Sequence, residues 1–170
     1  MKKIILYVAT SLDGFIARKN GSVDWLDKYN KTEEDYGYNE FLNSVSAVIL
    51  GNTTYREFGA PYPNKKCFVF SRKCQNQDNG ITYVSTSPKE FVKKLDINQG
   101  IMWLVGGAKI VESFFENKLV DELIITVIPI ILGGGIPLFL SNCVNGDLAL
   151  LNTKSYKSGI VQLHYKIRFN

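Results

Sequence analysis

The strongest constraint on the fold of this chain is a series of short apolar runs with little alternation between apolar and polar residues. The runs are residues 4–9, 47–51, 101–105 and 123–128, and they are rich in Ile, Val and Leu. A strand with one face in water alternates, whereas a strand covered on both faces is apolar throughout. These runs therefore predict the central strands of a sheet that is covered on both sides.

Segments with helical patterns separate the runs. Residues 33–45 carry apolar side chains at helical spacing, and Thr32 is placed to cap that helix. Residues 87–95 begin with Ser-Pro-Lys-Glu, which is typical of a capped helix start. The other expected elements are a helical turn at 54–58, strands at 67–71 and 81–84, and a helix through 110–115. Residues 148–156 and 160–169 are expected to form an antiparallel hairpin with one face exposed to solvent.

Strands that alternate with helices and end in an antiparallel pair indicate an α/β fold. The predicted architecture is a mostly parallel central sheet flanked by helices, with an antiparallel C-terminal hairpin. The chain has 170 residues, of which 45% are hydrophobic, and no linker or shift in composition divides it. We therefore expect a single domain over residues 1–170.

The composition restricts the chemistry available to this chain. It has one histidine, His164, and three scattered cysteines, so we predict no metal site, reduced thiols and a cytoplasmic location. His164 lies in an alternating run and is expected to be solvated.

The 20 basic residues exceed the 16 acidic ones by only four, spread along the chain, which argues against nucleic-acid binding. No apolar run approaches the ~20 residues of a membrane helix, so we expect no membrane partner.

Three strand ends carry residues suited to phosphate. In parallel sheets, ligands bind beyond the carboxyl ends of the strands. Glycines allow close backbone approach, hydroxyls and cations bind phosphate, and a helix N-terminus attracts anions. Each end also has a plainer interpretation, namely a helix cap, a solvated basic turn or a tight strand-to-helix turn. Three such ends in one small sheet favour an extended dinucleotide. The ends are Gly51-Asn52-Thr53-Thr54, Ser71-Arg72-Lys73 and Val105-Gly106-Gly107-Ala108-Lys109.

The order of these motifs resembles the dihydrofolate reductase family. Within it the chain is most similar to the riboflavin-biosynthesis reductase, the C-terminal domain of a bifunctional deaminase-reductase. The most specific segments are residues 11–17, Ser-Leu-Asp-Gly-Phe-Ile-Ala, and residues 129–139, Pro-Ile-Ile-Leu-Gly-Gly-Gly-Ile-Pro-Leu-Phe. The resemblance covers nearly the whole chain. It implies a dihydrofolate reductase-like fold and a reductase that takes a hydride from NADPH.

The resemblance also implies a set of cofactor-binding residues. By position, the nicotinamide is lined by Ala9 and Ile16, and the 2′-phosphate meets Ser71 and Arg72. The phosphates and the adenosine side are held by Gly51, Asn52, Thr53 and Thr54. The pyrophosphate cradle is formed by Val105, Gly106, Gly107, Ala108 and Lys109. The sequence departs from the family at one position that affects the choice between NADPH and NADH. Relatives commonly carry a basic residue where this chain has Asn52. Arg72 with Lys73, or Arg56, would have to supply the charge, so NADH stays open as an alternative cofactor.

On the substrate side, residues 21–26 resemble the loop that closes over the substrate in this fold. Trp25, Asp24 and Asp13 are the predicted substrate-binding residues, because an aromatic plane beside a carboxylate suits a flat nitrogen heterocycle. Asp13 and Asp24 are also the candidate catalytic proton donors, provided that burial raises their pKa. The plainer interpretations are a core role for Trp25 and turn or cap roles for both aspartates. Asn30 stands where a dihydrofolate reductase has its pterin-binding carboxylate.

These features predict an NADPH-dependent reductase of a small heterocyclic or carbonyl/imine substrate, similar to 5-amino-6-(5-phosphoribosylamino)uracil reductase. The alternatives are a dihydrofolate or pterin reductase and a nucleotide-binding module without turnover. We also expect a homodimer, with its contact in the apolar segment 128–140 and Leu138 within it.

Overall fold

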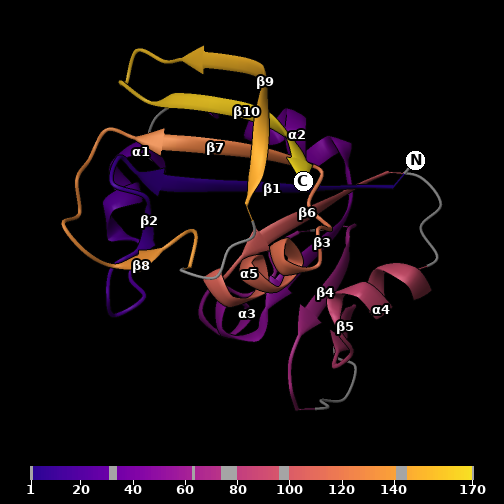
Figure 1. Cartoon of the computed structure of the whole chain (residues 1–170). Coiled ribbons are helices and arrows are strands. Elements are labelled where there is room, and N and C mark those ends of the chain that lie inside the picture. Colours follow the sequence, from indigo (N-terminus) through magenta and orange to yellow (C-terminus); the bar gives the residue numbers. More distant parts are fainter. Residues whose placement is uncertain are drawn as a thin grey trace.

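The protein is an α/β structure built on one eight-stranded sheet (Figure 1). The computed structural model describes residues 2–30, 34–62, 64–73, 80–95, 100–140 and 145–169. The strand order is β5-β4-β3-β6-β1-β7-β10-β9. The first six strands in this order pair in parallel, and β7, β10 and β9 pair antiparallel. The strands are β1 Lys2–Ser11, β3 Val45–Gly51, β4 Lys66–Phe70, β5 Ile81–Val84, β6 Gly100–Gly106, β7 Glu122–Ile128, β9 Gly146–Ser155 and β10 Val161–Phe169.

The expected parallel sheet with an antiparallel C-terminal edge is therefore confirmed. Its core lies on both faces, because alternate residues of the central strands belong to different hydrophobic clusters. Ile49 packs in the cluster that includes Phe114, whereas its neighbour Leu50 packs in the cluster around Trp103. The four side chains are between 0% and 6% exposed. Burial on both faces explains why the central strands are apolar without alternation.

The helices cover the two faces in pairs. Helices α4 and α5 contribute to the cluster around Phe114, and α2 and α3 contribute to the one around Trp103. The α4 helix begins with the predicted capping box between Ser87 and Glu90. No helix in the described ranges is long and apolar enough to cross a membrane. The helical segments are η1 Asp24–Leu26, α1 Asp27–Asn30, α2 Tyr38–Ser44, α3 Asn52–Phe58, α4 Pro88–Lys94 and α5 Ala108–Glu116.

The start of α2 differs from the prediction of a helix over residues 33–45. The helix begins at Tyr38, because Gly37 takes a left-handed conformation with φ 78°. The Asp35 carboxylate accepts hydrogen bonds from the N–H groups of Gly37 and Asn39, at 3.0 and 3.2 Å. Asp35 thus ends the preceding turn and supports the helix start. Thr32, the predicted cap, lies outside the described residues.

A second, two-stranded sheet was not predicted. It consists of β2 (Phe15–Ala17) and β8 (Ile136–Pro137). Backbone bonds extend this pairing, since Leu12 N–H donates to Ile130 O at 2.8 Å and Leu138 N–H donates to Gly14 O at 3.0 Å. The two most specific sequence segments, 11–17 and 129–139, therefore form one structural unit.

Two expectations about surface residues are wrong. Leu138, expected at a dimer contact, is 3% exposed and packs in the chain's own core, because the β2–β8 pairing pulls its segment inward. His164 is half-buried rather than solvated, and its Nε2 lies 2.8 Å from Glu122 Oε2. The antiparallel pairing of β10 with β7 brings it close to this carboxylate, which Lys3 also contacts.

Candidate functional site

The three predicted phosphate-compatible strand ends meet at one edge of the sheet. In the parallel ladders, Gly51 at the end of β3 lies opposite Phe70 of β4, and Leu50 lies opposite Gly106 of β6. The residues that follow these strands, Ser71 and Gly107, therefore start from neighbouring positions. A Cβ atom added to Gly51 would lie 3.6 Å from Gly106 O, so the two glycine turns approach each other closely.

The contact between α3 and α5 is tighter still. Gly107 has φ 67°, which side-chain-bearing residues rarely adopt, and a Cβ atom at this position would lie 2.9 Å from Thr54 Oγ1. Glycine is therefore required here for both backbone conformation and space. No side chain caps the N-terminus of α5, a helix of nine residues. Its first N–H groups and the positive end of its dipole are directed to this edge.

Polar and cationic groups surround the glycine turns. The Oδ1 atom of Asn52 is buried and has no hydrogen-bond partner among the described residues. A pocket of about 300 Å³ is lined by Asn52, Thr53, Arg56 and Glu57. Four exposed cations lie on the segments that follow the strands, and none forms an ion pair within the described part of the chain. These cations are Arg56, Arg72, Lys73 and Lys109.

The sheet opens beside this edge. The ladder between β1 and β6 runs only to the pair Leu6–Leu104, although β1 continues to Ser11 in register with β7 (Figure 1). Ala9 lies on this free stretch of β1 and packs with the cluster around Trp25. The end of β1 therefore parts from β6 at the carboxyl edge, where a flat group could enter between the strands.

The contacts of Asp13 do not suit it to proton donation, and its predicted contact with a substrate stays a prediction. Its carboxylate accepts hydrogen bonds from the N–H groups of Leu132 and Gly133, at 3.0 and 2.8 Å. Hydrogen bonding from Ser11, with these two backbone bonds, holds the pKa of Asp13 below its usual value. The group is exposed, so the burial that proton donation requires is missing. Asp13 instead fastens the end of β1 to the glycine-rich loop 132–135.

Comparison with known proteins identifies the family of this chain. Residues 2–162 match the family model of the RibD C-terminal domain. The chain belongs to the RibD C-terminal domain family. It is 41% identical to YwjB, an uncharacterized protein of Bacillus subtilis (strain 168), over 96% of this chain and 97% of that protein.

Two solved structures share the fold of this RibD-type domain. A protein of Shewanella sp. PV-4 assigned to riboflavin biosynthesis superposes with a TM-score of 0.85 and 27% identity, covering 98% of this chain and 99% of that one. The dihydrofolate reductase of Enterococcus faecalis, solved with NADP(H), superposes with a TM-score of 0.67 and 15% identity, covering 97% and 96%. The predicted dihydrofolate reductase-like fold is confirmed, and the family is reductase-like.

Asp24 of this RibD-type domain is also unsuited to proton donation. Its carboxylate pairs with the Arg18 guanidinium at 2.7 and 3.0 Å and accepts a hydrogen bond from Ser22 Oγ at 2.7 Å. The bond from Arg18, followed by that from Ser22, lowers the pKa of Asp24 to about 2. Because the group is exposed and ionised, the condition attached to its predicted catalytic role is not met.

Trp25 lies in a hydrophobic cluster with Tyr29, Ile128 and Ile160 and is 5% exposed. This is the core position given by the plainer interpretation of the sequence. Its Nε1 atom has no hydrogen-bond partner in the described ranges. Ala9, the predicted nicotinamide-lining residue, packs against the same cluster. Contact of Trp25 with a substrate stays a prediction.

The remaining predicted residues are divided between the two faces. Ile16 packs against the core cluster around Phe114, and Val105 packs against the cluster around Trp103. Only their backbone groups are thus in a position to serve a ligand at the strand ends. Two features of the site were not predicted from the sequence. They are the close approach of Gly107 to Thr54 and the pocket beside Arg56 and Glu57. The helical spacing of Asn52, Thr53 and Arg56 was the available signal for that pocket.

Proposed function

We propose that this protein is a reductase that uses NADPH to reduce a small heterocyclic or carbonyl/imine substrate. The observation that carries the proposal is the meeting of three strand ends at one edge of the sheet, around the uncapped N-terminus of α5. The carboxyl ends of neighbouring parallel strands always lie at one edge, but here all three carry residues suited to phosphate, as an extended nucleotide with several phosphate groups requires. Membership of a reductase-like family supports the same conclusion.

The groups present fit NADPH chemically. The backbone at the start of α5, residues 107–109, suits a bridging pyrophosphate, because no side chain caps this helix and its N-terminus is the positive end of the helix dipole. Ser71 and Arg72 suit the 2′-phosphate, and Arg56, which forms no ion pair within the described residues, adds the charge that Asn52 lacks. The buried, unpartnered Oδ1 of Asn52 is an acceptor available to a ligand donor. These cations favour NADPH over NADH.

When bound, NADPH supplies the hydride, so the chain needs no residue to carry that step. The backbone groups of Ala9 and Ile16 would line the reacting ring, and Ala9 lies on the stretch of β1 beyond its pairing with β6. The apolar cluster against which Ala9 packs would keep water away from this point and help to hold the reactants in place. The substrate class is the one expected from the resemblance to 5-amino-6-(5-phosphoribosylamino)uracil reductase.

One observation favours a second candidate, a nucleotide-binding module without turnover. Both carboxyl groups predicted to donate a proton, Asp13 and Asp24, are exposed and have a lowered pKa. Neither is protonated near neutral pH, so neither predicted donor can supply the proton that a substrate of this class needs. The binding of NADPH would then occur without its oxidation across a substrate panel.

Binding and turnover separate the two candidates. Titration with NADPH and NADH, followed by calorimetry, is expected to show saturable binding with preference for NADPH. A panel of pterins, pyrimidines, quinones and imines then reports turnover through the loss of NADPH absorbance. Binding with turnover supports the reductase, and binding without turnover supports the module. Absence of binding to either dinucleotide would reject both.

A further inference from the structure

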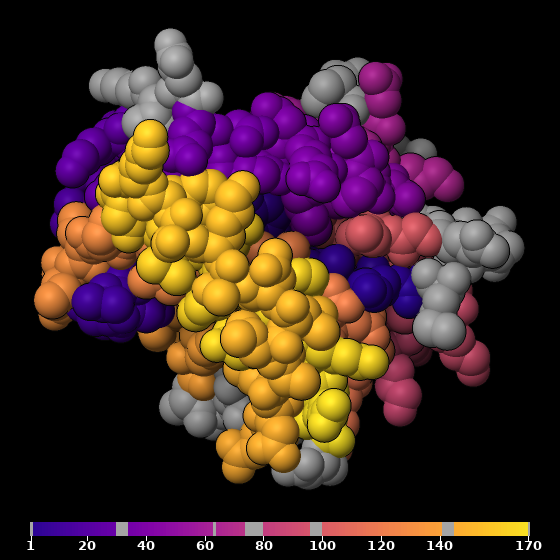
Figure 2. Space-filling model, turned by 90° about the horizontal axis from the view of Figure 1, so that it is seen from above, coloured from indigo at the N-terminus to yellow at the C-terminus, as the bar shows by residue number. Residues whose placement is uncertain are grey.

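A group of buried polar side chains lies on the sheet face that carries the Trp103 cluster. Gln162 Nε2 lies 3.3 Å from Tyr7 Oη, 3.0 Å from Thr126 Oγ1 and 3.3 Å from Tyr36 O. Tyr7 and Thr126 are 9% and 7% exposed. In Figure 2 the yellow C-terminal strands adjoin the purple segment that contains α2, and Gln162 joins the two sides. The proposed cofactor contacts use none of these side chains.

The strand register places this group beside Ala9. Ala9 lies opposite Thr126 in the β1–β7 ladder, and Thr126 lies opposite Gln162 in the β7–β10 ladder. Tyr7 precedes Ala9 by two positions, so both side chains point to the same face. Because the Tyr7 hydroxyl reaches Gln162, it lies near the level of Ala9. The hydroxyl is therefore close to the residue that lines the reacting ring in the proposed function.

The hydrogen bonds of Tyr7 leave its own hydrogen available. Tyr36 O can only accept a hydrogen bond, so the amide end of Gln162 that faces it is the nitrogen, which can only donate. Tyr7 Oη thus accepts from Gln162. A hydrogen bond from Thr126 also lowers the pKa of Tyr7, as donation to the phenol oxygen does. Within the described ranges the Tyr7 hydroxyl donates no hydrogen bond, so it can donate to a ligand.

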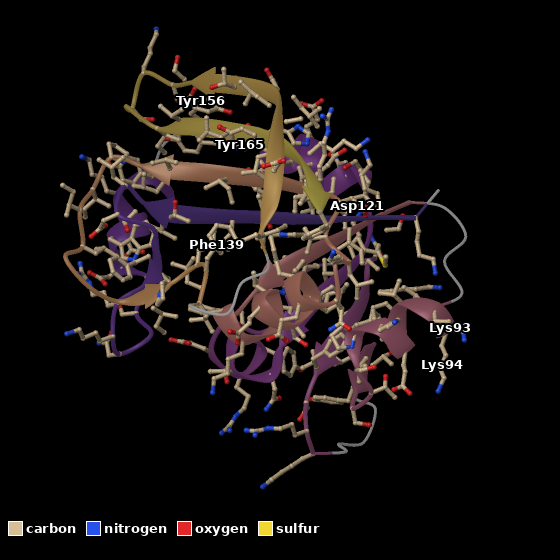
Figure 3. All side chains as sticks on the ribbon, in the orientation of Figure 1. Lys93, Lys94, Asp121, Phe139, Tyr156 and Tyr165 are labelled. Atoms are coloured by element: carbon tan, nitrogen blue, oxygen red, sulfur yellow. The ribbon has the colours of Figure 1, made fainter. Side chains whose placement is uncertain are left out.

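The Tyr7 hydroxyl keeps its proton at neutral pH. Burial raises its pKa above the ordinary value, against the two hydrogen bonds that lower it, and the nearby Tyr156 and Asp35 raise it further. Figure 3 shows Tyr156 on the β9–β10 hairpin, over the end of the sheet where β1 finishes. The two carboxyl groups predicted as donors are ionised under the same conditions. Tyr7 carries a proton where they do not.

The Tyr7 ring is also held in one orientation. Its backbone oxygen accepts a hydrogen bond from Trp103 Nε1 at 2.9 Å. The ring of Phe41 packs edge-on against it, with centroids 4.6 Å apart and planes at 82°. A donor fixed before the substrate arrives needs little rearrangement during the reaction.

We propose that Tyr7 is the proton donor of the reductase and that Gln162 positions its hydroxyl. The inference rests on the proposed function. As the carbon of a C=O or C=N bond receives the hydride of NADPH, the oxygen or nitrogen takes the proton of Tyr7. A C–H and an O–H or N–H bond form, the double bond becomes single, and NADPH is oxidised to NADP⁺. The Tyr7 oxygen then regains a proton from water.

The basicity of the reduced atom decides how much a substrate needs this proton. Reduction of an aldehyde leaves a strongly basic alkoxide, whereas reduction of a quinone leaves a phenolate, in which the ring delocalises the charge. Proton donation therefore assists the aldehyde more than the quinone. Pyridine carboxaldehyde, a heterocyclic carbonyl, and menadione, a quinone, are suitable probes.

The first test compares turnover of the two probes by the full chain with NADPH. Tyr7→Phe is expected to lower kcat for pyridine carboxaldehyde about 100-fold, with KM raised no more than about tenfold. Its effect on menadione is expected to be smaller. The matched control is Tyr62→Phe, which removes a phenol hydroxyl from another ring packed on Trp103, with centroids 5.1 Å apart, and leaves kcat unchanged. Circular dichroism establishes that each variant is folded.

The second test measures binding without reaction. Calorimetry of pyridine carboxaldehyde with the protein and NADP⁺ is expected to show binding weakened about threefold to tenfold by Tyr7→Phe, the loss of one hydrogen bond. Gln162→Leu removes the bond that positions the hydroxyl. It is expected to lower kcat less than Tyr7→Phe does, and again more for the aldehyde than for menadione. A merely structural loss would affect both probes equally.

Several results would overturn the proposal. They are a Tyr7→Phe variant that keeps its kcat for the aldehyde, equal losses on both probes, or an equal loss in Tyr62→Phe. A wild type that binds NADPH but reduces neither probe would overturn the role of Tyr7 and leave the cofactor site standing. A wild type that does not bind NADPH would overturn the proposed function and this inference with it.

Discussion

The close approach of α3 and α5 predicts a specific cost for adding one methyl group at Gly107. With φ 67° and ψ 134°, an alanine there costs about 1–3 kcal/mol, because side-chain-bearing residues rarely adopt this backbone conformation. Its Cβ atom would also lie 2.9 Å from Thr54 Oγ1, so the threonine must leave its rotamer at a cost of about 1 kcal/mol. Gly107→Ala should therefore lower the free energy of unfolding by about 2–4 kcal/mol.

The two parts of this cost can be separated. Gly59 has φ 70° and nothing within 4 Å of an added Cβ atom, so Gly59→Ala reports the backbone part without a contact. Thr54→Ala removes the Oγ1 atom. In that background Gly107→Ala should cost about 1 kcal/mol less than in the wild type, because the two residues are coupled.

Urea unfolding measures these differences, with the fluorescence of the buried Trp25 and Trp103 as the signal. The reasoning is refuted if Gly107→Ala costs the same in the wild-type and Thr54→Ala backgrounds. Additive costs would mean that α3 and α5 do not meet at Gly107. The convergence of the strand ends, on which the proposed function depends, would then lose its closest contact.

Two further predictions concern the sheet. Trp103→Phe removes the buried bond in which Trp103 Nε1 donates to Tyr7 O at 2.9 Å, and it should lower the free energy of unfolding by about 2 kcal/mol in the same assay. Burial raises the pKa of Glu122, but bonds from Lys3 and His164 outweigh it and leave that pKa below its ordinary value. A carboxylate with a lowered pKa stabilises the fold above its unfolded pKa, and this contribution is lost as the pH falls through the folded value. Glu122→Gln should flatten the acid limb of the stability–pH curve, and an unchanged limb would contradict this.

The parallel sheet could be predicted because its central strands obey a simple rule. Residues 47–51 and 101–105 are apolar throughout, and the structure buries alternate side chains of both strands on opposite faces. Once the parallel strands were located, the candidate binding residues could be predicted too, because ligand-binding residues come directly after parallel strands. The capping box at Ser87 and Glu90 was local in sequence and was also predictable.

Other features depend on contacts between distant residues, which no local pattern reveals. The hydrogen bonds that the N–H groups of Leu132 and Gly133 donate to the Asp13 carboxylate span about 120 positions in the chain. The β2–β8 pairing involves strands of three and two residues, too short to show a period. Leu138 was assigned to the surface for this reason, although that pairing buries it.

The central claim is that the strand ends around Gly107 bind NADPH, and one titration tests it most directly. Calorimetry with NADPH is carried out on the wild type, on Gly107→Ala and on Gly59→Ala at a temperature where all three are folded. The account predicts saturable binding to the wild type and to Gly59→Ala, with binding to Gly107→Ala weakened at least about tenfold, a loss of about 1.4 kcal/mol. Equal binding by all three proteins, or no binding by the wild type, would contradict it.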